Sequence, residues 1–578
     1  MLRREYPRPD FVRNSWLSLN GPWGFAFDDK NVGIQEKWWG KPEIFTKTIQ
    51  VPFAFQTELS GINDPSFHDV VWYHKNFVVK KNPQEQIILH FGAIDFISDV
   101  YLNGQFIFHH EGGQTGFSVD ITPYLIEGEQ QLVVRVFDSS TDLYFPRGKQ
   151  YWKEKSESIW YTRTTGIWQS VWLESLPEKH VSNIRFTPDF DRGIMKADIQ
   201  VNDIGLPLYL KVSDRAGNIF AHEIDMIVQR NNLVEIKVFH NPKDAEQKAW
   251  TPENPYLFNV EVYYGKDVIK TYFGVRKIST QDGKIYLNNK PYYLKLILDQ
   301  GYWPESLLTP PSIEALKKDI LLSKAMGFNG ARKHQKVEDP YFAYLADQLG
   351  YLIWGEMASS IQFSEQSAKY NLSAWEDAVL RDYNHPSIIA WVPLNESWGV
   401  PEIRHNLEQQ QHSVNLYDLI KKLDSTRLIS NNDGWEITVT DICGIHNYCH
   451  GRIDEKEQQL AFKHDISSTK NLLASKPAKR PIYAEGYHHQ GSPIVLTEFG
   501  GIAFDGEQQG WGYTATNSGA ELISEYRRII EAIKDSDSLA GYCYTQLTDV
   551  EQEINGLLTY HRETKVPLEE IKKSNDLI

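Results

Sequence analysis

The sequence predicts a multidomain protein in which two β-sandwiches precede a C-terminal (β/α)8 barrel. Its 578 residues are too many for a single hydrophobic core. Hydrophobic residues make up 41% of the chain and charged residues 24%, which is typical of folded chains and not of disordered ones. Short β-type segments separated by turn residues fill the first half, whereas apolar strands alternate with capped helices after Asp282-Gly283.

The first predicted domain, residues 1–178, is a β-sandwich. Segments rich in β-branched and aromatic residues are separated by turn residues, as in 98–102 and 105–108. Asn103-Gly104 lies between these two segments, and both residues accept the positive φ of a type I′ turn. We therefore expect a tight hairpin at this point.

The second predicted domain, residues 179–277, repeats this pattern on a smaller scale. The β-type segments 208–212, 233–239 and 257–264 are separated by Gly, Asp and Pro turns. The length suits a second and smaller sandwich.

The third predicted domain, residues 278–578, contains helices with clear boundary signals. A helix is expected over 313–326 with Ser312 as its N-cap, and another from Asp339 to Gly350. Two capping boxes indicate further helix starts. They are Ser373–Glu376, whose helix must end before Pro386, and Ser518–Glu521.

Eight apolar strands lie between or beside these helices. They are 293–297, 330–332, 351–354, 388–392, 428–430, 442–444, 494–496 and 539–543. Eight strand-helix units in one run predict a closed parallel barrel, with an open doubly wound sheet as the alternative. A glycine-rich turn after the first strand is missing, which argues against a nucleotide site in such a sheet.

Charge and composition disfavour several classes of binding partner. The formal net charge of -16, without a basic cluster, disfavours nucleic acid and anionic membranes as partners. The N-terminus runs into polar sequence and no long apolar run follows, so we expect a cytoplasmic protein. Cys443, Cys449 and Cys543 match neither a disulfide framework nor a zinc site and are expected to be reduced thiols.

Two glutamates directly follow predicted barrel strands. Glu396 follows the fourth strand and Glu498 the seventh, and barrel enzymes react at these strand ends. Glycoside hydrolysis needs two carboxyl groups beside the anomeric carbon, and the fourth and seventh strands face one another across an eight-stranded mouth. For either residue alone, an ion pair with a nearby Arg or Lys is the plain alternative.

The C-terminal half resembles glycoside hydrolase family 2, which holds β-galactosidases, β-glucuronidases and β-mannosidases. The matching stretches are 326–334, 384–396 and 496–499. The resemblance implies an N-terminal jelly-roll sugar-binding domain, an immunoglobulin-like sandwich and a catalytic TIM barrel. It also implies a retaining exo-β-glycosidase that acts on an oligosaccharide or glycoside without a cofactor. Family members are often dimers or tetramers, so a homo-oligomer is a possible state.

By the same resemblance, Glu396 is the acid/base and Glu498 is the nucleophile. The acid/base must hold a proton near neutral pH, so we expect an apolar rim including Trp398 and the charge of Glu498 to raise the pKa of Glu396. Asn395 is expected to bind the sugar 2-hydroxyl.

The resemblance further implies that Arg332 and Tyr448 orient and ionise Glu498. His334 is a candidate substrate contact. As possible metal ligands, His334, His446 and His450 are interpreted as ordinary loop histidines, and no metal site is predicted.

The sugar is less clearly indicated. Asp299, Trp303 and Gln546 are candidate sugar contacts at the ends of the first and eighth strands. Relatives that cleave glucuronides carry Asn-x-Lys where this chain has Glu553-Ile-Asn555, and Glu553 would repel a uronide. We therefore favour a neutral, β-galactosidase-like substrate. The alternatives are a β-glucuronidase, β-galacturonidase, β-mannosidase or β-galactofuranosidase, or a non-catalytic carbohydrate-binding protein.

The segment 144–163 is long for a connection within a sandwich and is rich in aromatic and basic residues. Long loops of this kind are often functional. We expect it to reach over the barrel mouth and restrict cleavage to a terminal sugar, with an exposed or dimer-forming loop as the alternative.

Overall fold

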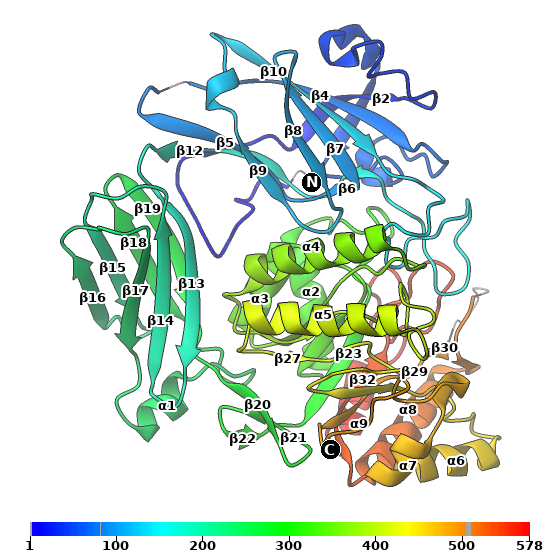
Figure 1. Ribbon diagram of the computed structural model, residues 1–578. Coiled ribbons are helices and arrows are strands. Elements are labelled where there is room, and N and C mark those ends of the chain that lie inside the picture. The colour runs from blue at the N-terminus through cyan, green and yellow to red at the C-terminus, as the bar shows by residue number, and fades with distance from the viewer. Residues whose placement is uncertain (1–2, 81, 505–509) are drawn as a thin grey trace.

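The computed structural model describes residues 3–80, 82–504 and 510–578, which form three β-rich or α/β units in chain order (Figure 1). The first sandwich, blue to cyan in Figure 1, packs above the barrel, and the second lies beside the barrel. Within the described residues, no helix has the length and apolar character that crossing a membrane requires.

The first unit is a sandwich of two antiparallel sheets around one apolar core. One sheet has the order β1 (Trp16–Ser18), β12 (Val171–Pro177), β5 (Glu85–Phe91) and β9 (Phe117–Asp120). The other has the order β3 (Lys47–Val51), β2 (Gly21–Phe27), β4 (Val70–Val78), β10 (Glu129–Phe137), β7 (Ile97–Leu102) and β8 (Gln105–Glu111). A short pair, β6 (Ile94–Asp95) and β11 (Gly166–Ile167), completes it.

The predicted hairpin is confirmed between β7 and β8. Leu102 pairs with Gln105, and the two residues between them have φ of 52° at Asn103 and 79° at Gly104. Both values lie in the left-handed region that a type I′ turn requires.

The second unit is a smaller sandwich of immunoglobulin-like architecture. Its sheets are β13 (Val181–Asp189), β14 (Ile194–Val201) and β17 (Asn231–Lys237), and β16 (Ile219–Ile224), β15 (Leu208–Ser213), β18 (Phe258–Tyr264) and β19 (Asp267–Phe273). The helix α1 (Pro242–Lys248) follows β17, and a small sheet of β20 (Ile278–Gln281), β21 (Lys284–Leu287) and β22 (Lys290–Pro291) leads to the barrel.

The eight predicted strands form one parallel sheet. Its members are β23 (Leu294–Asp299), β24 (Gly330–Lys333), β25 (Leu352–Glu356), β26 (Ile388–Val392), β27 (Leu428–Ile429), β28 (Cys443–His446), β29 (Ile494–Gly500) and β32 (Leu539–Thr545). The sheet closes between β27 and β28, where the Ile442 N–H donates to the Ile429 carbonyl at 3.2 Å and Gly434 bridges Ile445. The closed barrel is therefore confirmed over the open sheet.

Side chains alternate between two cores across each barrel strand. Leu294, Leu296 and Leu298 belong to the cluster inside the barrel, whereas Ile297 belongs to the cluster between barrel and helices. The helices are α2 (Ile313–Ala325), α3 (Pro340–Leu349), α4 (Glu365–Asp382), α5 (Leu407–Leu423), α6 (Lys456–Ile466), α7 (Thr469–Ala474), α8 (Gly519–Lys534) and α9 (Leu568–Asn575). Two further short strands are β30 (Ile502–Ala503) and β31 (Thr514–Ala515).

Three of the four predicted helix starts are confirmed, and the start at Ser373 is wrong. The side chains of Ser312, Asp339 and Ser518 cap α2, α3 and α8. Helix α4 instead begins after Ser364. The Ser364 hydroxyl accepts a hydrogen bond from the Ser367 N–H at 3.0 Å, and the Ser367 hydroxyl accepts one from the Ser364 N–H. Ser373 lies within α4, where the backbone N–H groups already have helical acceptors and a capping side chain has no donor to satisfy.

Candidate active site

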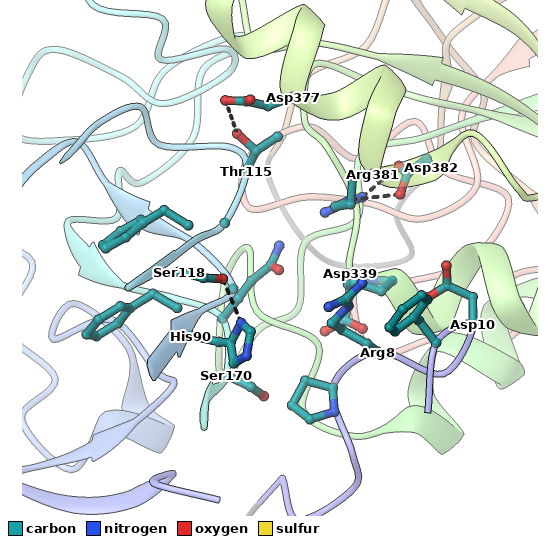
Figure 2. A pocket seen from close by; sticks show the side chains of 18 of the residues that line it. Arg8, Asp10, His90, Thr115, Ser118, Ser170, Asp339, Asp377, Arg381 and Asp382 are labelled. Atoms are coloured by element: carbon teal, nitrogen blue, oxygen red, sulfur yellow. Dashed lines mark hydrogen bonds and ion pairs between the residues drawn. The ribbon is translucent and has the colours of Figure 1, made fainter. Parts of the chain in front are cut away.

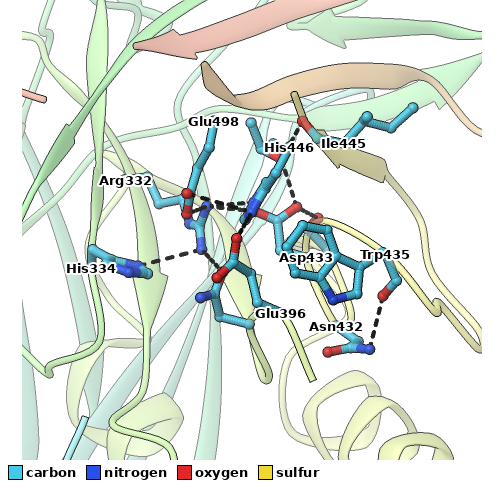
Figure 3. A network of polar contacts seen from close by, with 12 residues as sticks. Arg332, His334, Glu396, Asn432, Asp433, Trp435, Ile445, His446 and Glu498 are labelled. Atoms are coloured by element: carbon cyan, nitrogen blue, oxygen red, sulfur yellow. Dashed lines mark hydrogen bonds and ion pairs between the residues drawn. The ribbon is translucent and has the colours of Figure 1, made fainter. Parts of the chain in front are cut away.

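The two candidate catalytic glutamates meet inside the barrel mouth (Figure 3). Glu396 follows β26 and Glu498 lies in β29. One carboxylate oxygen of Glu396, one of Glu498 and one ring nitrogen of His446 all lie within 4.8 Å of one another. Two residues that are distant in sequence therefore flank one small gap.

The backbone at Glu396 adopts a conformation that few non-glycine residues take. Its φ is 52°, and that of Ser397 is 62°. Such conformations cost of order 1–3 kcal/mol each and persist where neighbouring groups hold them. Here the Glu396 N–H donates to the Asp433 carbonyl at 2.9 Å, and the Ser397 N–H donates to Asn432 Oδ1 at 2.9 Å. These bonds hold the turn that directs the Glu396 carboxylate into the barrel.

Arg332 is fully buried and organises the acids around it. Its guanidinium lies 3.0 Å from Glu498 Oε1, 2.9 Å from Glu356 Oε2 and 2.7 Å from Asp433 Oδ2. It also donates to Asn395 Oδ1 at 2.5 Å. The planar fork of an arginine suits this multiple pairing.

Tyr448 holds the other oxygen of Glu498. Its hydroxyl donates to Glu498 Oε2 at 2.7 Å and lies 2.9 Å from Thr545 Oγ1, while its ring stacks on Tyr513 at 3.4 Å. Both carboxylate oxygens of Glu498 are thus positioned, one by Arg332 and one by Tyr448.

His446 belongs to the network, although the sequence analysis gave it no catalytic role. Its Nδ1 lies 2.8 Å from Glu396 Oε1 and 3.5 Å from Glu498 Oε2, and its Nε2 lies 3.3 Å from Asp433 Oδ2. Burial acts to lower its pKa, but the charge of Glu498 and the hydrogen bonds to Asp433 and Glu396 raise the pKa to about 10. The interpretation of His446 as an ordinary loop histidine is therefore wrong.

The expected raised pKa of Glu396 is also wrong for this structure. Burial acts to raise the pKa, but the hydrogen bond and positive charge of His446, with a smaller contribution from Lys149, lower it. Trp398, which was expected to form an apolar rim, packs edge-on against Trp160 with the ring centroids 5.0 Å apart. The lowered pKa of Glu396 and the raised pKa of His446 both favour an ion pair between the two side chains.

Two further acids belong to the network. Burial raises the pKa of Glu356 to about 7 although Arg332 acts to lower it, whereas Arg332 and His446 outweigh burial at Asp433 and lower its pKa to about 2. Glu356 ends β25 as Glu396 follows β26, so the signal that selected Glu396 could also have found it. Asp433 follows a strand of two residues and carries no comparable signal.

His334 and Asn395 lie beside this network, and their role as substrate contacts stays a prediction. His334 Nδ1 lies 3.1 Å from Glu356, and burial followed by the charge of Arg332 lowers its pKa well below the usual range. Figure 3 shows the Arg332 guanidinium between His334 and Glu498.

Asp299 and Trp303 are not brought to the glutamates. Asp299 pairs with Lys333 at 2.7 Å, in register with it on neighbouring strands. Asp299 is two residues after Ile297 on the same strand, so its side chain points to the same side, toward the helices and away from the barrel interior. Trp303 belongs to the same outer cluster and is covered by the Arg562 guanidinium at 4.9 Å. The prediction of sugar contacts at these two residues is wrong.

Gln546 and Glu553 form one chain of hydrogen bonds. Gln546 Nε2 donates to Asn555 Oδ1 at 2.7 Å, Asn555 Nδ2 donates to Glu553 Oε1 at 3.0 Å, and the Tyr161 hydroxyl donates to Glu553 Oε2. Burial raises the pKa of Glu553, although Lys149 acts to lower it. This chain connects the end of the eighth strand to the segment 144–163.

The segment 144–163 does reach the barrel mouth, as predicted. Trp160 contacts Trp398, two residues after Glu396, and the Gly148 N–H donates to the Ser359 carbonyl at 2.9 Å. A side chain at Gly148, whose φ is 57°, would place its Cβ 2.4 Å from the Gln335 carbonyl oxygen. The segment is therefore packed tightly against the barrel.

Glu396, His446 and Glu498 could offer three ligand atoms to a metal ion. A metal ligand must be deprotonated, and an imidazole with a pKa of about 10 is protonated at neutral pH. The Arg332 guanidinium beside Glu498 also opposes a dication. The arrangement suits proton transfer better than metal binding.

Family models match the chain along nearly its whole length. The sugar binding domain of glycosyl hydrolases family 2 matches residues 16–177, the general model of that family matches 179–276, and its TIM barrel domain matches 278–578. The chain belongs to glycosyl hydrolase family 2.

Relatives in family 2 carry two different names. The chain is 25% identical over 438 residues to a β-galactosidase from Thermoanaerobacter pseudethanolicus, covering 71% of this chain and 54% of that protein. It is 22% identical over 626 residues to a β-glucuronidase from Streptococcus agalactiae, covering 98% of this chain and 97% of that protein. The chain spans about half the length of the first curated relatives it matches.

Solved structures of family 2 enzymes have the same fold. A β-glucuronidase from Ruminococcus gnavus superposes with a TM-score of 0.79 at 20% identity, over 99% of both chains. At this identity the similarity shows the fold alone.

Proposed function

We propose that this family 2 protein is a retaining exo-β-glycosidase with Glu396 as acid/base and Glu498 as nucleophile. The observation that carries the proposal is the approach of their carboxylate oxygens to within 4.8 Å. Retaining enzymes hold the two carboxyl groups roughly 5–5.5 Å apart, whereas inverting enzymes separate them by roughly 6.5–9.5 Å to admit a water. The short separation supports double displacement.

In the first step, Glu498 attacks the anomeric carbon while a proton passes to the leaving oxygen as the glycosidic bond breaks. Glu396 delivers that proton, which the Glu396–His446 pair carries in the free protein. In the second step, Glu396 takes a proton from water, and the water oxygen displaces Glu498 from the glycosyl ester. Asn395, fixed by Arg332, is placed to bind the 2-hydroxyl.

The stereochemistry of the first product tests this proposal. The protein is incubated with a panel of p-nitrophenyl β-glycosides, and the sugar released first is followed by proton NMR before mutarotation. We expect the β-anomer to appear first. Early α-anomer would show inversion, and no turnover across the panel would favour a non-catalytic carbohydrate-binding protein.

For the sugar, a neutral hexoside of the β-galactoside type remains our first candidate. Glu553 places an acid near the barrel mouth, where it would oppose a second carboxylate, and the segment 144–163 supports recognition of a terminal residue. β-Mannosides and β-galactofuranosides belong on the same panel.

Lys149 favours a second candidate, a β-glucuronide or β-galacturonide. Its side chain is buried, with the ammonium 5.6 Å from the Trp160 ring centroid and 5.8 Å from that of Tyr161. Within the part of the chain that the structure describes, this ammonium makes no ion pair or hydrogen bond. Its charge nevertheless acts on Glu396 and Glu553. A substrate carboxylate at the mouth would find a cation that makes no ion pair with the other described residues.

The variant Lys149→Met separates the two candidates. If a uronide is the substrate, kcat/KM on p-nitrophenyl β-glucuronide or β-galacturonide should fall about 30-fold to 5000-fold, because truncating one partner of a buried charge pair costs about 2–5 kcal/mol. Turnover of a neutral β-galactoside should show only the smaller change that follows from the effect of Lys149 on the pKa of Glu396. Equal changes on both substrates, or no uronide turnover by the wild type, would support the neutral candidate.

A further inference from the structure

A cavity of about 250 Å³ lies where the first sandwich, the second sandwich and the barrel meet (Figure 2). Figure 2 shows His90, Ser118 and Ser170 on the sandwich side, and Arg8, Asp339 and Arg381 across from them. None of the residues of the barrel-mouth network lines this cavity. Asp377 and Leu380 are exposed on its rim, so the cavity opens to solvent.

Three nitrogen donors that line the cavity have no acceptor in the described part of the protein. They are Trp172 Nε1, Gln169 Nε2 and Arg381 Nη1. Trp172 and Gln169 are 5% and 3% exposed. A buried donor without an acceptor costs about 1–3 kcal/mol, so water or a ligand oxygen should meet these groups.

Acceptors line the cavity as well. Asp10 makes no ion pair or side-chain hydrogen bond with the other described residues, and Asp377 receives only a long bond of 3.5 Å from Thr115. Asp339 and Asp382 add two more carboxylates, which pair with Arg3 and Arg381. The guanidinium groups of Arg3, Arg8 and Arg381 also line the cavity and balance most of the charge of the four carboxylates, so the lining favours a neutral ligand over a strongly charged one. The free donors disfavour an apolar ligand.

The hydroxyl groups of a ligand could satisfy both the donors and the acceptors of the lining, because each hydroxyl can donate and accept a hydrogen bond. Phe91, Phe117 and Trp172 also line the cavity, but Phe91 stacks on Phe117 and Trp172 stacks on His90, so hydrogen-bonding groups and not free ring faces define the ligand. A water occupies about 30 Å³ in the liquid, so the space would hold several waters or one small saccharide.

We propose that this cavity binds a neutral monosaccharide or disaccharide, at a site separate from the barrel mouth. The ligand accepts hydrogen bonds from Trp172 and Gln169 and donates to the carboxylates of Asp10 and Asp377. Because the lining comes from all three domains, bound sugar also stabilises their packing. This proposal does not depend on the sugar specificity of the barrel.

Crystals of the wild-type protein soaked with D-galactose, D-glucose or maltose test the proposal directly. We expect density for a pyranose ring in the cavity, with oxygens within hydrogen-bond distance of Trp172 Nε1 and Gln169 Nε2. Ordered waters alone in the cavity, or sugar only in the barrel mouth, overturn it.

Calorimetric titration with the sugar seen in the crystal provides the solution test. Trp172→Phe and Gln169→Leu should each weaken binding at the cavity about threefold to tenfold, because each loses one hydrogen bond. Gln411→Leu, at an exposed position on α5, is the matched control and should leave binding unchanged. Circular dichroism confirms that each variant is folded. Equal affinities in all variants would contradict the donor roles and overturn the site.

Discussion

Glu498→Ala should lower kcat on aryl β-glycosides by a factor on the order of 10⁴ or more, without unfolding the protein. The reason is that no other carboxylate in the network can replace it. Glu356 and Asp433 form ion pairs with Arg332, and Glu396 pairs with His446. Steady-state kinetics on the most reactive p-nitrophenyl substrate measures the loss.

A rescue experiment then separates a nucleophile from a merely structural acid. Azide should restore part of the turnover of Glu498→Ala by attacking from the vacated face, which yields the α-glycosyl azide. Glu365→Ala, at an exposed position on α4, is the matched control and should retain wild-type activity. Wild-type kcat in Glu498→Ala would eliminate the proposed nucleophile.

Arg332→Met should lower the free energy of unfolding by about 3–5 kcal/mol and abolish most activity. The substitution leaves three buried carboxylates, those of Glu356, Asp433 and Glu498, without their shared cation. It also releases Asn395 from its donor. Denaturant unfolding measures the stability, and aryl glycoside turnover measures the activity.

Arg562→Met provides a matched control. Arg562 pairs with the buried Asp319 at 3.1 Å and does not contact the glutamates, so its loss should destabilise the fold while turnover persists. Adding Glu356→Gln to Arg332→Met should recover part of the stability, because it removes one unpaired carboxylate. An Arg332→Met protein as stable as the wild type would contradict this account of the network.

Local sequence signals predicted strands and turns well where the structure depends on only a few neighbouring residues. All eight barrel strands and the Asn103-Gly104 hairpin were confirmed, because apolar runs and positive-φ residues act over a few positions. Ser373 shows the limit. A Ser-x-x-Glu pattern has the same letters inside a helix as at its start, and only the earlier cap at Ser364 distinguishes the two.

Strand parity decided which strand-end residues enter the barrel. Asp299 leaves the barrel on the helix side with Ile297, whereas His446 alternates with Ile445 and points to the glutamates. Period-two counting could have rejected Asp299 and selected His446, but it fails at Glu498, which has the parity of the outward Leu496 and enters the barrel through the register shift between Leu496 and Phe499.

The sequence by itself determined the two sandwiches, the barrel and the presence of an acid near the ends of the fourth and seventh strands, because periodicity and turn chemistry are local. Only the tertiary structure decided that these acids approach within 4.8 Å, that His446 lies between them and that the pKa of Glu396 is lowered. Distances across a closed ring depend on every intervening strand. A pKa depends on the charges that folding brings near and on the water it removes.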